Sequence, residues 1–229
     1  MTDATPSLAR RTVAEALGTA LLLAAVVGSG IMAERLAAGN VALALLANTI
    51  ATGAALVAIL LALGPISGAH LNPALTLAVA WERRLPWTDV PPYLLAQVLG
   101  AFAGVAIAHT MYDLPLFALS HHVRAGGGQI VSEFVATFGL VIVVWGSARR
   151  SPLAAPFAVG AYVTAAYWFT ASTSFANPAV AAARAVTDTF AGIRPLDVPG
   201  FVGAELCGAA AATLLAQWLL ADMAGVEPS

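Results

Sequence analysis

Two short stretches place an asparagine where its side chain could both cap a helix and donate hydrogen bonds. Residues 67–74 and 172–179 contain the triplets Asn72-Pro73-Ala74 and Asn177-Pro178-Ala179. In both, a long apolar run stops at small and polar residues, and the proline reopens a short apolar segment. Asn is a preferred N-cap, and proline fits the first helical position because its missing N–H has no partner there. We therefore predict two half-helices, capped by Asn72 and Asn177.

Two acidic residues, Glu15 and Glu133, lie inside long apolar runs. An ionisable side chain in a membrane span costs roughly 3 kcal/mol or more unless it is paired. These carboxylates could relay protons, or they could accept hydrogen bonds from the backbone of the two re-entrant stretches. Their symmetric placement in a repeat, described below, favours the second interpretation, that of loop anchors. Gln97 and Glu205 are also related by the repeat and are interpreted in the same way.

The remaining polar candidates carry weaker signals. His121 and His122 are adjacent on a loop and cannot easily share an ion, so we expect a solvated loop and no metal site. Cys207 is a lone cysteine, which excludes a disulfide framework and a cysteine-based metal cluster. His70 could line a vestibule on the cytoplasmic side or make a structural hydrogen bond, and both interpretations stay open.

The sequence contains no nucleophile–base constellation, Walker loop or zinc-ligand spacing. Nothing therefore predicts an enzyme, a bound cofactor or pumping driven by nucleotide hydrolysis.

The composition indicates the medium in which these residues work. Of the 229 residues, 60% are hydrophobic and 10% are charged, whereas a soluble domain has about 25% charged residues. We predict an integral membrane protein whose partner is the lipid bilayer, and the absence of a strongly basic face argues against nucleic acid. A spanning helix needs about 20 apolar residues. Six runs reach that length, at about 12–33, 41–63, 91–111, 129–148, 153–171 and 200–221.

Two further apolar segments are too short to span a bilayer. Residues 73–81 and 178–186 have nine residues each, or about 14 Å at 1.5 Å per residue. If they enter from opposite faces, they meet at the midplane and complete a seventh pseudo-span. Irregular backbone at that depth is tolerated only where protein buries it or water lines it. The pattern therefore predicts a polar cavity or pore at the midplane.

The chain contains an internal repeat. Glu15 and Thr19 recur 118 positions later as Glu133 and Thr137, and the Asn-Pro-Ala triplet recurs after 105 positions. Each copy holds three spans and a half-helix, so the second copy is inverted in the membrane, with the site at the repeat interface. We predict one membrane channel domain over residues 1–229, with inverted repeats at about 12–111 and 129–221. An external loop at about 112–128 links the two copies.

The arginines predict the orientation of the chain. With six spans the termini share one side, which holds three Arg-Arg doublets, whereas the other side holds four single arginines. Positively charged residues gather in cytoplasmic loops. We therefore expect cytoplasmic termini.

Together these features resemble the aquaporin, or major intrinsic protein, family. The resemblance rests on the two Asn-Pro-Ala motifs, the Ala-Glu-x-x-Gly-Thr opening at 14–19 and the run Ile-Ser-Gly-Ala-His-Leu-Asn-Pro-Ala-Leu-Thr at 66–76. It implies an all-α integral membrane fold, with a six-transmembrane-helix bundle, two re-entrant half-helices and an inverted repeat. It also implies a pore in each protomer and a homotetramer.

The physics of such a pore fits a passive channel for small neutral solutes. Two half-helix N-termini at the pore centre each carry about half a positive charge, which repels cations. The Asn72 and Asn177 amides would donate hydrogen bonds to a passing water or hydroxyl oxygen.

The family has an outer constriction of four positions, and here the chain departs from the usual pattern. An arginine usually follows the second motif, whereas this chain has Val180. The four filter positions fall on Thr52, Ala165 or its neighbour Ala166, Ser174 or its neighbour Phe175, and Val180. With less bulk and no fixed charge, the mouth is expected to be wider and less polar than that of a strict water channel.

Arg184 follows Val180 by one helical turn on the same face of the half-helix, about 6 Å farther from the midplane. It could keep a positive charge in the outer vestibule. It could instead pair with a lipid headgroup or a loop acid such as Asp188. The sequence leaves both open.

Residues 177–193 look like the bacterial aquaglyceroporin branch associated with arsenic resistance. That resemblance implies a bacterial inner membrane and a cargo of water, glycerol-like polyols, arsenous acid or organic arsenicals. Two other functions compete: an ion- or proton-coupled secondary transporter built on an inverted repeat, and a membrane structural protein with a closed pore. Flux that saturates or responds to a proton gradient would favour the transporter, and absence of any permeability would favour the structural protein.

Overall fold

The computed structural model describes residues 6–151 and 153–219, and its regular structure there is entirely helical. The helices are α1 (Leu8–Leu36), α2 (Val41–Ser67), α3 (Pro73–Trp81), α4 (Val90–Met111), α5 (Gly127–Arg150), α6 (Ala155–Phe169), α7 (Pro178–Arg184) and α8 (Val198–Leu219), with short 3₁₀ turns η1 (Trp87–Asp89) and η2 (Pro195–Asp197). Five are long and apolar enough to cross a membrane: α1, α2, α5, and α4 and α8 with their preceding 3₁₀ turns. The chain is a multi-pass membrane protein.

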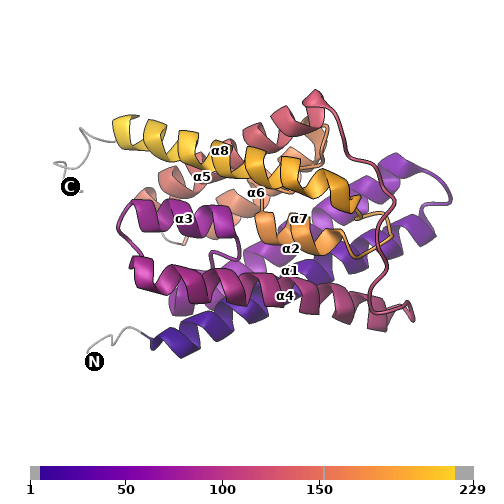
Figure 1. Ribbon diagram of the computed structural model, residues 1–229, viewed down its shortest axis with the longest axis horizontal. Helices are drawn as coiled ribbons and strands as arrows, with labels where there is room; N and C mark the ends of the chain where they lie inside the picture. Colours follow the sequence, from indigo (N-terminus) through magenta and orange to yellow (C-terminus); the bar gives the residue numbers. More distant parts are fainter. Residues whose placement is uncertain (1–5, 152, 220–229) are drawn as a thin grey trace.

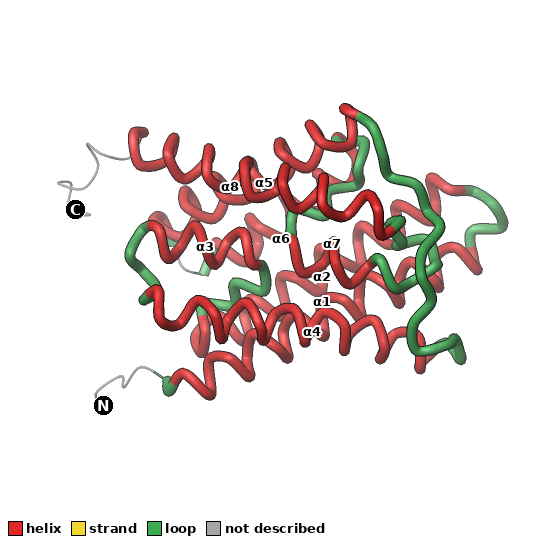
Figure 2. Tube along the Cα trace, in the orientation of Figure 1, coloured by secondary structure: helices red, strands yellow, loops and turns green. Residues whose placement is uncertain are grey.

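The two short helices lie in the middle of the bundle. α3 and α7 follow one another along its long axis, between α8 and α5 on one side and α4 and α1 on the other (Figure 1). The tube view shows that loops, not helices, lead into both (Figure 2). The start of α1 and the end of α8 lie at the same end of the bundle. This arrangement brings the N-termini of α3 and α7 together at the centre.

The two halves of the chain pack by the same scheme. α1 packs against α2 and α4, and α5 packs against α6 and α8. Close approach depends on glycine: a Cβ on Gly100 of α4 would strike the Ala16 carbonyl of α1, and a Cβ on Gly208 of α8 would strike the Phe134 carbonyl of α5. Small residues of this kind let membrane helices pack backbone to backbone.

The predicted span at 153–171 is shorter in the structure. α6 has 15 residues, about 22 Å at 1.5 Å per residue, which is less than a full crossing. Thr170 caps α6 in an extended conformation, and the chain turns there into the second re-entrant stretch. The predicted half-helix at 178–186 likewise ends earlier, at Arg184, whereas the one at 73–81 has the predicted bounds.

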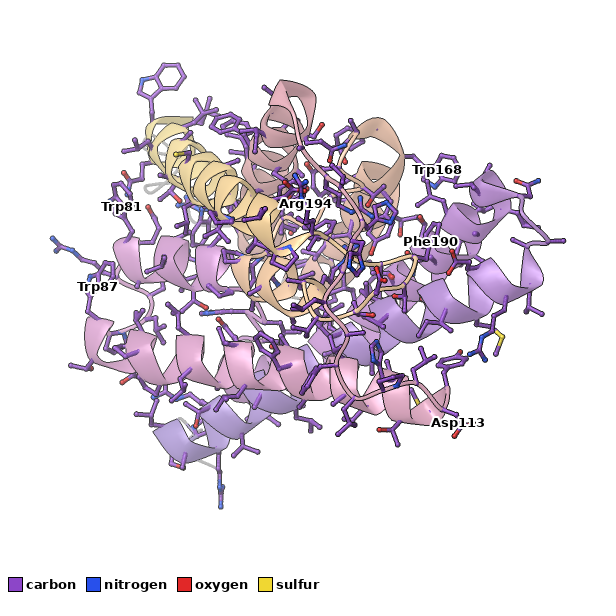
Figure 3. All side chains as sticks on the ribbon, turned by 45° about the vertical axis from the view of Figure 1, so that its right-hand side comes forward. Trp81, Trp87, Asp113, Trp168, Phe190 and Arg194 are labelled. Atoms are coloured by element: carbon purple, nitrogen blue, oxygen red, sulfur yellow. The ribbon has the colours of Figure 1, made fainter. Side chains whose placement is uncertain are left out.

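The outer surface is apolar along its middle. Exposed large aliphatic side chains cover the helices there, among them Leu17, Leu21, Leu46, Ile50, Leu99 and Val135. Exposed tryptophans lie toward the two ends, with Trp81 and Trp87 at one end and Trp168 at the other (Figure 3). Tryptophan is enriched where a membrane meets water, so this surface fits a bilayer with the bundle axis across it.

Candidate functional site

Asn72 and Asn177 cap the two half-helices, as the sequence predicts. The Oδ1 atom of Asn72 accepts from Ala74 N at 2.9 Å and Leu75 N at 3.4 Å. The Oδ1 atom of Asn177 accepts from Ala179 N at 3.0 Å and from Val180 N at 3.3 Å. Pro73 and Pro178 occupy the first helical positions, where no N–H is needed. The side-chain oxygens are therefore engaged, and the amide NH₂ groups are free to point elsewhere.

Each NH₂ group holds the opposite re-entrant stretch. Asn72 Nδ2 donates to the Ala176 carbonyl, and Asn177 Nδ2 donates to the Leu71 carbonyl, both at 2.7 Å. An amide nitrogen carries two hydrogens. One hydrogen of each asparagine thus ties the two half-helices together, and the other remains available to a solute.

Buried carboxylates hold the irregular backbone before each half-helix. The oxygens of Glu15 accept from Ser67 Oγ at 2.7 Å, His70 N at 2.9 Å and Leu71 N at 2.7 Å. Ala69 and Leu71 adopt positive φ values of 44° and 53°, a conformation that costs roughly 1–2 kcal/mol per non-glycine residue. The Glu15 hydrogen bonds offset that cost, which is the geometry of a loop anchor.

Glu133 does the same for the second stretch. Its oxygens accept from Phe175 N at 2.9 Å and from Ala176 N at 2.7 Å. Glu133 is fully buried, as is Glu15. With both oxygens of each carboxylate bound to backbone N–H groups, neither residue has the free, exposed carboxyl group that a proton relay needs.

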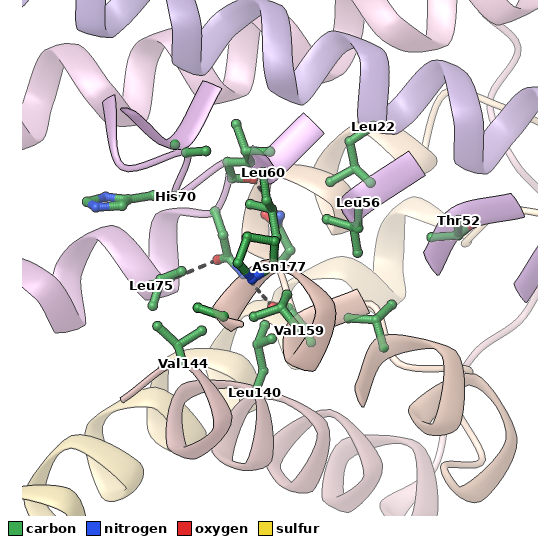
Figure 4. A pocket seen from close by; sticks show the side chains of 18 of the residues that line it. Leu22, Thr52, Leu56, Leu60, His70, Leu75, Leu140, Val144, Val159 and Asn177 are labelled. Atoms are coloured by element: carbon green, nitrogen blue, oxygen red, sulfur yellow. Dashed lines mark hydrogen bonds between the residues drawn. The ribbon is translucent and has the colours of Figure 1, made fainter. Parts of the chain in front are cut away.

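A cavity of about 440 Å³ runs beside the two asparagines. His70 and Thr52 lie on opposite sides of Asn177 along it (Figure 4). Aliphatic side chains form most of its wall, including Leu22, Leu56, Leu60, Leu140, Val144 and Val159. Few polar atoms interrupt this wall, and they concentrate at the asparagines and at the two ends.

His70 combines the two roles that the sequence left open. Its side chain lines the cavity, and its Nδ1 lies 3.2 Å from Thr76 Oγ1. Its ring packs at 5.5 Å from the Tyr93 ring. The hydrogen bond therefore holds the imidazole in place as part of the wall.

The structure corrects one predicted filter residue. Thr52, Ser174 and Val180 line the cavity, but Ala165 is exposed on the outer surface of α6, and Tyr167 lines the cavity in its place. Two residues along a helix rotate the side chain by about 200°, so Ala165 faces nearly the opposite way. The connection from α6 to Asn177 is shorter than the predicted spacing assumed. Ala166, the neighbouring alternative, is buried but is also not part of the wall.

Arg184 remains a cation beside the cavity. It lines the wall and is only 3% exposed. Its Nε donates to the Ala191 carbonyl, and its Cζ lies 3.4 Å from the centroid of the Phe175 ring. The alternative of an ion pair with Asp188 is wrong, because that carboxylate accepts from His121 N at 2.9 Å and pairs with His121 Nδ1 at 3.1 Å. The hydrogen bonds from the His121 backbone and ring lower the pKa of Asp188.

A family model described as Major intrinsic protein matches residues 3–174. The chain belongs to the major intrinsic protein family. Its function class is therefore a passive transmembrane channel, and the family predicted from the motifs is confirmed.

This major intrinsic protein is similar in sequence to several named proteins. It is 61% identical over 213 residues to aquaglyceroporin AqpS of Rhizobium meliloti (strain 1021), which covers 93% of this chain and 91% of that one. It is 35% identical over 162 residues to aquaporin Z of Rhodopseudomonas palustris, covering 64% and 67%. It is 32% identical over 148 residues to a probable glycerol uptake facilitator protein of Thermotoga maritima, covering 58% and 62%.

A solved structure has the same fold. The X-ray structure of the aquaglyceroporin from Plasmodium falciparum superposes with a TM-score of 0.74 at 17% identity, and the match covers 95% of this chain and 98% of that one. The predicted aquaporin-like fold class is thereby confirmed.

In this major intrinsic protein a second arginine, Arg124, supports the second re-entrant stretch beside the cavity. It comes from the loop between α4 and α5, and its Nε donates to the Gly192 carbonyl at 2.8 Å and its Nη1 to the Ser172 carbonyl at 3.0 Å. Its Cζ lies 5.0 Å from the centroid of the Phe175 ring. Burial lowers the pKa of Arg124 to about 10, so it stays charged at neutral pH. The only signal for this residue in the sequence is a single arginine in a predicted external loop.

Proposed function

We propose that this protein is a passive channel for water and small neutral solutes of glycerol size, with arsenous acid or organic arsenicals as further cargo. The observation that carries this proposal is the cavity itself. Asn72 and Asn177 each keep one N–H for a solute oxygen, while aliphatic side chains form most of the remaining wall. Such a lining suits a molecule that has hydroxyl groups on one side and an apolar body on the other.

Cations are excluded at two places. The N-termini of α3 and α7 meet near the asparagines, and each helix end carries about half a positive charge. Arg184 adds a full charge toward the outer end. A cation would have to leave its water shell next to these charges, whereas a neutral solute would not.

The residue after the second motif favours solutes larger than water. Val180 contributes a short apolar side chain to the cavity wall, which also includes the hydroxyl groups of Thr52 and Tyr167. The name of the relative AqpS of Rhizobium meliloti, an aquaglyceroporin, supports this assignment.

The assembly and orientation belong to the same proposal. Four protomers would pack through the exposed apolar helix faces in a bacterial inner membrane, with cytoplasmic termini. The inverted repeats would extend over about 12–111 and 129–221, of which residues 152, 220 and 221 lie outside the described residues. The loop near 112–128 would be external.

Stopped-flow measurements on reconstituted vesicles test the function. Water, glycerol, urea and arsenous acid should be compared in one preparation, with empty vesicles as the control. We expect flux of water and of glycerol that does not saturate and does not respond to a proton gradient. A protein that passes water but excludes glycerol would contradict the proposed solute class, and saturable, proton-dependent flux would indicate a coupled transporter.

A further inference from the structure

Two buried acids hold neighbouring backbone amides of the second re-entrant stretch. Glu133 on α5 binds Phe175 N and Ala176 N, and Glu205 on α8 accepts from Asn177 N through Oε1 at 3.0 Å. Both acids are fully buried. The two carboxyl groups bind consecutive amides of the same stretch, Glu133 Oε2 that of Ala176 and Glu205 Oε1 that of Asn177. Three consecutive backbone amides, the last of them that of the capping asparagine, are thus fixed by a carboxyl pair.

The first half of the chain fills the equivalent place differently. There Glu15 Oε2 accepts from Leu71 N at 2.7 Å and from Gln97 Nε2 at 2.8 Å. Gln97 and Glu205 are 108 positions apart, the same offset that relates Gly100 to Gly208 at the helix crossings. The Gln97 amide supplies an N–H to its carboxylate. A second ionised carboxylate has no hydrogen to give.

The pair of acids in the second half therefore needs one proton. Two ionised carboxylates that bind consecutive amides of one stretch repel each other, and in an apolar interior the doubly charged state is strongly disfavoured. Both oxygens of Glu133 already accept backbone N–H groups, as a carboxylate does. In the described part of the chain, Glu205 Oε2 has no donor of its own. A hydrogen on this oxygen would complete the pair.

The nearest cations do not take over that role. Arg184 on α7 and Arg124 from the loop before α5 both lie over the ring of Phe175, whose backbone N–H binds Glu133. Within residues 6–151 and 153–219, neither arginine forms an ion pair with either acid. Arg184 binds the Ala191 carbonyl, and Arg124 binds the Gly192 and Ser172 carbonyls. The repulsion between the two carboxylates must therefore be relieved within the pair.

We propose that Glu205 is a positioning residue held as a neutral carboxylic acid, which donates its Oε2 hydrogen to Glu133. In this form it performs for the second half the task that Gln97 performs for the first. It binds Asn177 N with one oxygen and orients Glu133 with the other, and so fixes the direction in which the Asn177 amide faces the cavity. This role does not depend on which solute the channel carries.

Infrared spectroscopy and a conservative variant test the proposal together. Difference spectra of reconstituted wild type and Glu205→Gln at neutral pH should show a carbonyl band of a protonated carboxylic acid that only the wild type has. The exposed acid variant Glu34→Gln serves as the control and should keep the band. Absence of the band in the wild type overturns the proposal, whatever the solute permeabilities are.

Permeability gives the second readout. Glutamine can donate and accept as the neutral acid does, so Glu205→Gln should keep glycerol permeability within about twofold of the wild type. Glu205→Leu leaves Asn177 N without its acceptor and Glu133 without the proposed Glu205 hydrogen, and should lower permeability at least about tenfold, or prevent folding. If Glu205→Gln is as impaired as Glu205→Leu, the neutral-acid role is wrong.

Discussion

Tyr167 donates a hydrogen bond to Thr52 in the wall of the cavity, with 3.4 Å between the two hydroxyl oxygens. The contact joins α6 to α2, and it places an aromatic side chain where the sequence predicted Ala165 or Ala166. We therefore expect the size limit of the channel to depend on a tyrosine that spacing alone did not identify.

Replacing Tyr167 tests that correction. Tyr167→Ala should raise glycerol permeability about tenfold, equal to a barrier lowered by about 1.4 kcal/mol, because the ring no longer narrows the mouth. Stopped-flow light scattering gives the ratio of glycerol to water permeability. Ala165→Phe adds a ring on the exposed face of α6 and should leave that ratio unchanged. If the Ala165 variant changes selectivity and the Tyr167 variant does not, the predicted residue was right after all.

Val180 forms another part of the cavity wall. Val180→Arg should lower glycerol permeability about tenfold and water permeability less, because the long charged side chain would fill a place that is now short and apolar. The matched control is Val180→Leu, which adds volume without charge and should have a smaller effect. Equal glycerol permeability in all three proteins would remove Val180 from the filter. Arsenous acid uptake by the same vesicles extends the comparison to a second cargo.

Arg184 should keep cations out. Arg184→Gln removes the charge but keeps a polar side chain, and we expect cation flux to rise about tenfold, the effect of a few kcal/mol or less of lost repulsion. Asp188→Asn is the control, because its carboxylate pairs with His121 and not with Arg184. Potassium flux is measured in vesicles with an imposed gradient. No change in the Arg184 variant would end its assignment to the outer vestibule.

Glu15 should matter for stability. Glu15→Gln places an NH₂ group where Gln97 and the backbone donors already point, so buried donors lose their acceptor at a cost of about 1–3 kcal/mol each. The midpoint of unfolding in detergent should fall, whereas that of Glu34→Gln, at an exposed position, should not. An unchanged midpoint for Glu15→Gln would contradict the anchoring role and reopen the proton-relay interpretation.

The Arg124→Lys variant tests whether Arg124 acts through its hydrogen bonds or through its charge. Arg124→Lys keeps the positive charge but cannot reach both the Gly192 and the Ser172 carbonyls in the same planar geometry. We expect faster hydrogen exchange at residues 172–176, with a loss of about 1.5–3 kcal/mol of local stability. Exchange in the first re-entrant stretch, at residues 68–72, is the internal control and should not change. Identical exchange in both proteins would mean that Arg124 does not hold this stretch.

The sequence by itself determined the architecture, because the relevant signals are local or periodic. Apolar length predicts spans, asparagine followed by proline predicts a capped helix start, and an internal repeat predicts a second copy of both. Asn72, Asn177, Glu15 and Glu133 were identified in this way. These predictions needed no knowledge of which side chain faces which.

Only the tertiary structure decided the contacts between distant segments. Whether Ala165 or Tyr167 faces the cavity depends on the rotation of α6, and a difference of two residues in loop length moves a side chain by about 200° around the helix. Arg124 meets Phe175 because the loop between α4 and α5 folds back over the second re-entrant stretch. Glu205 and Glu133 bind consecutive backbone amides because α8 lies against α5. Local sequence specifies a cap or a span, but it does not specify how far a loop folds back or how a helix is rotated against its neighbours.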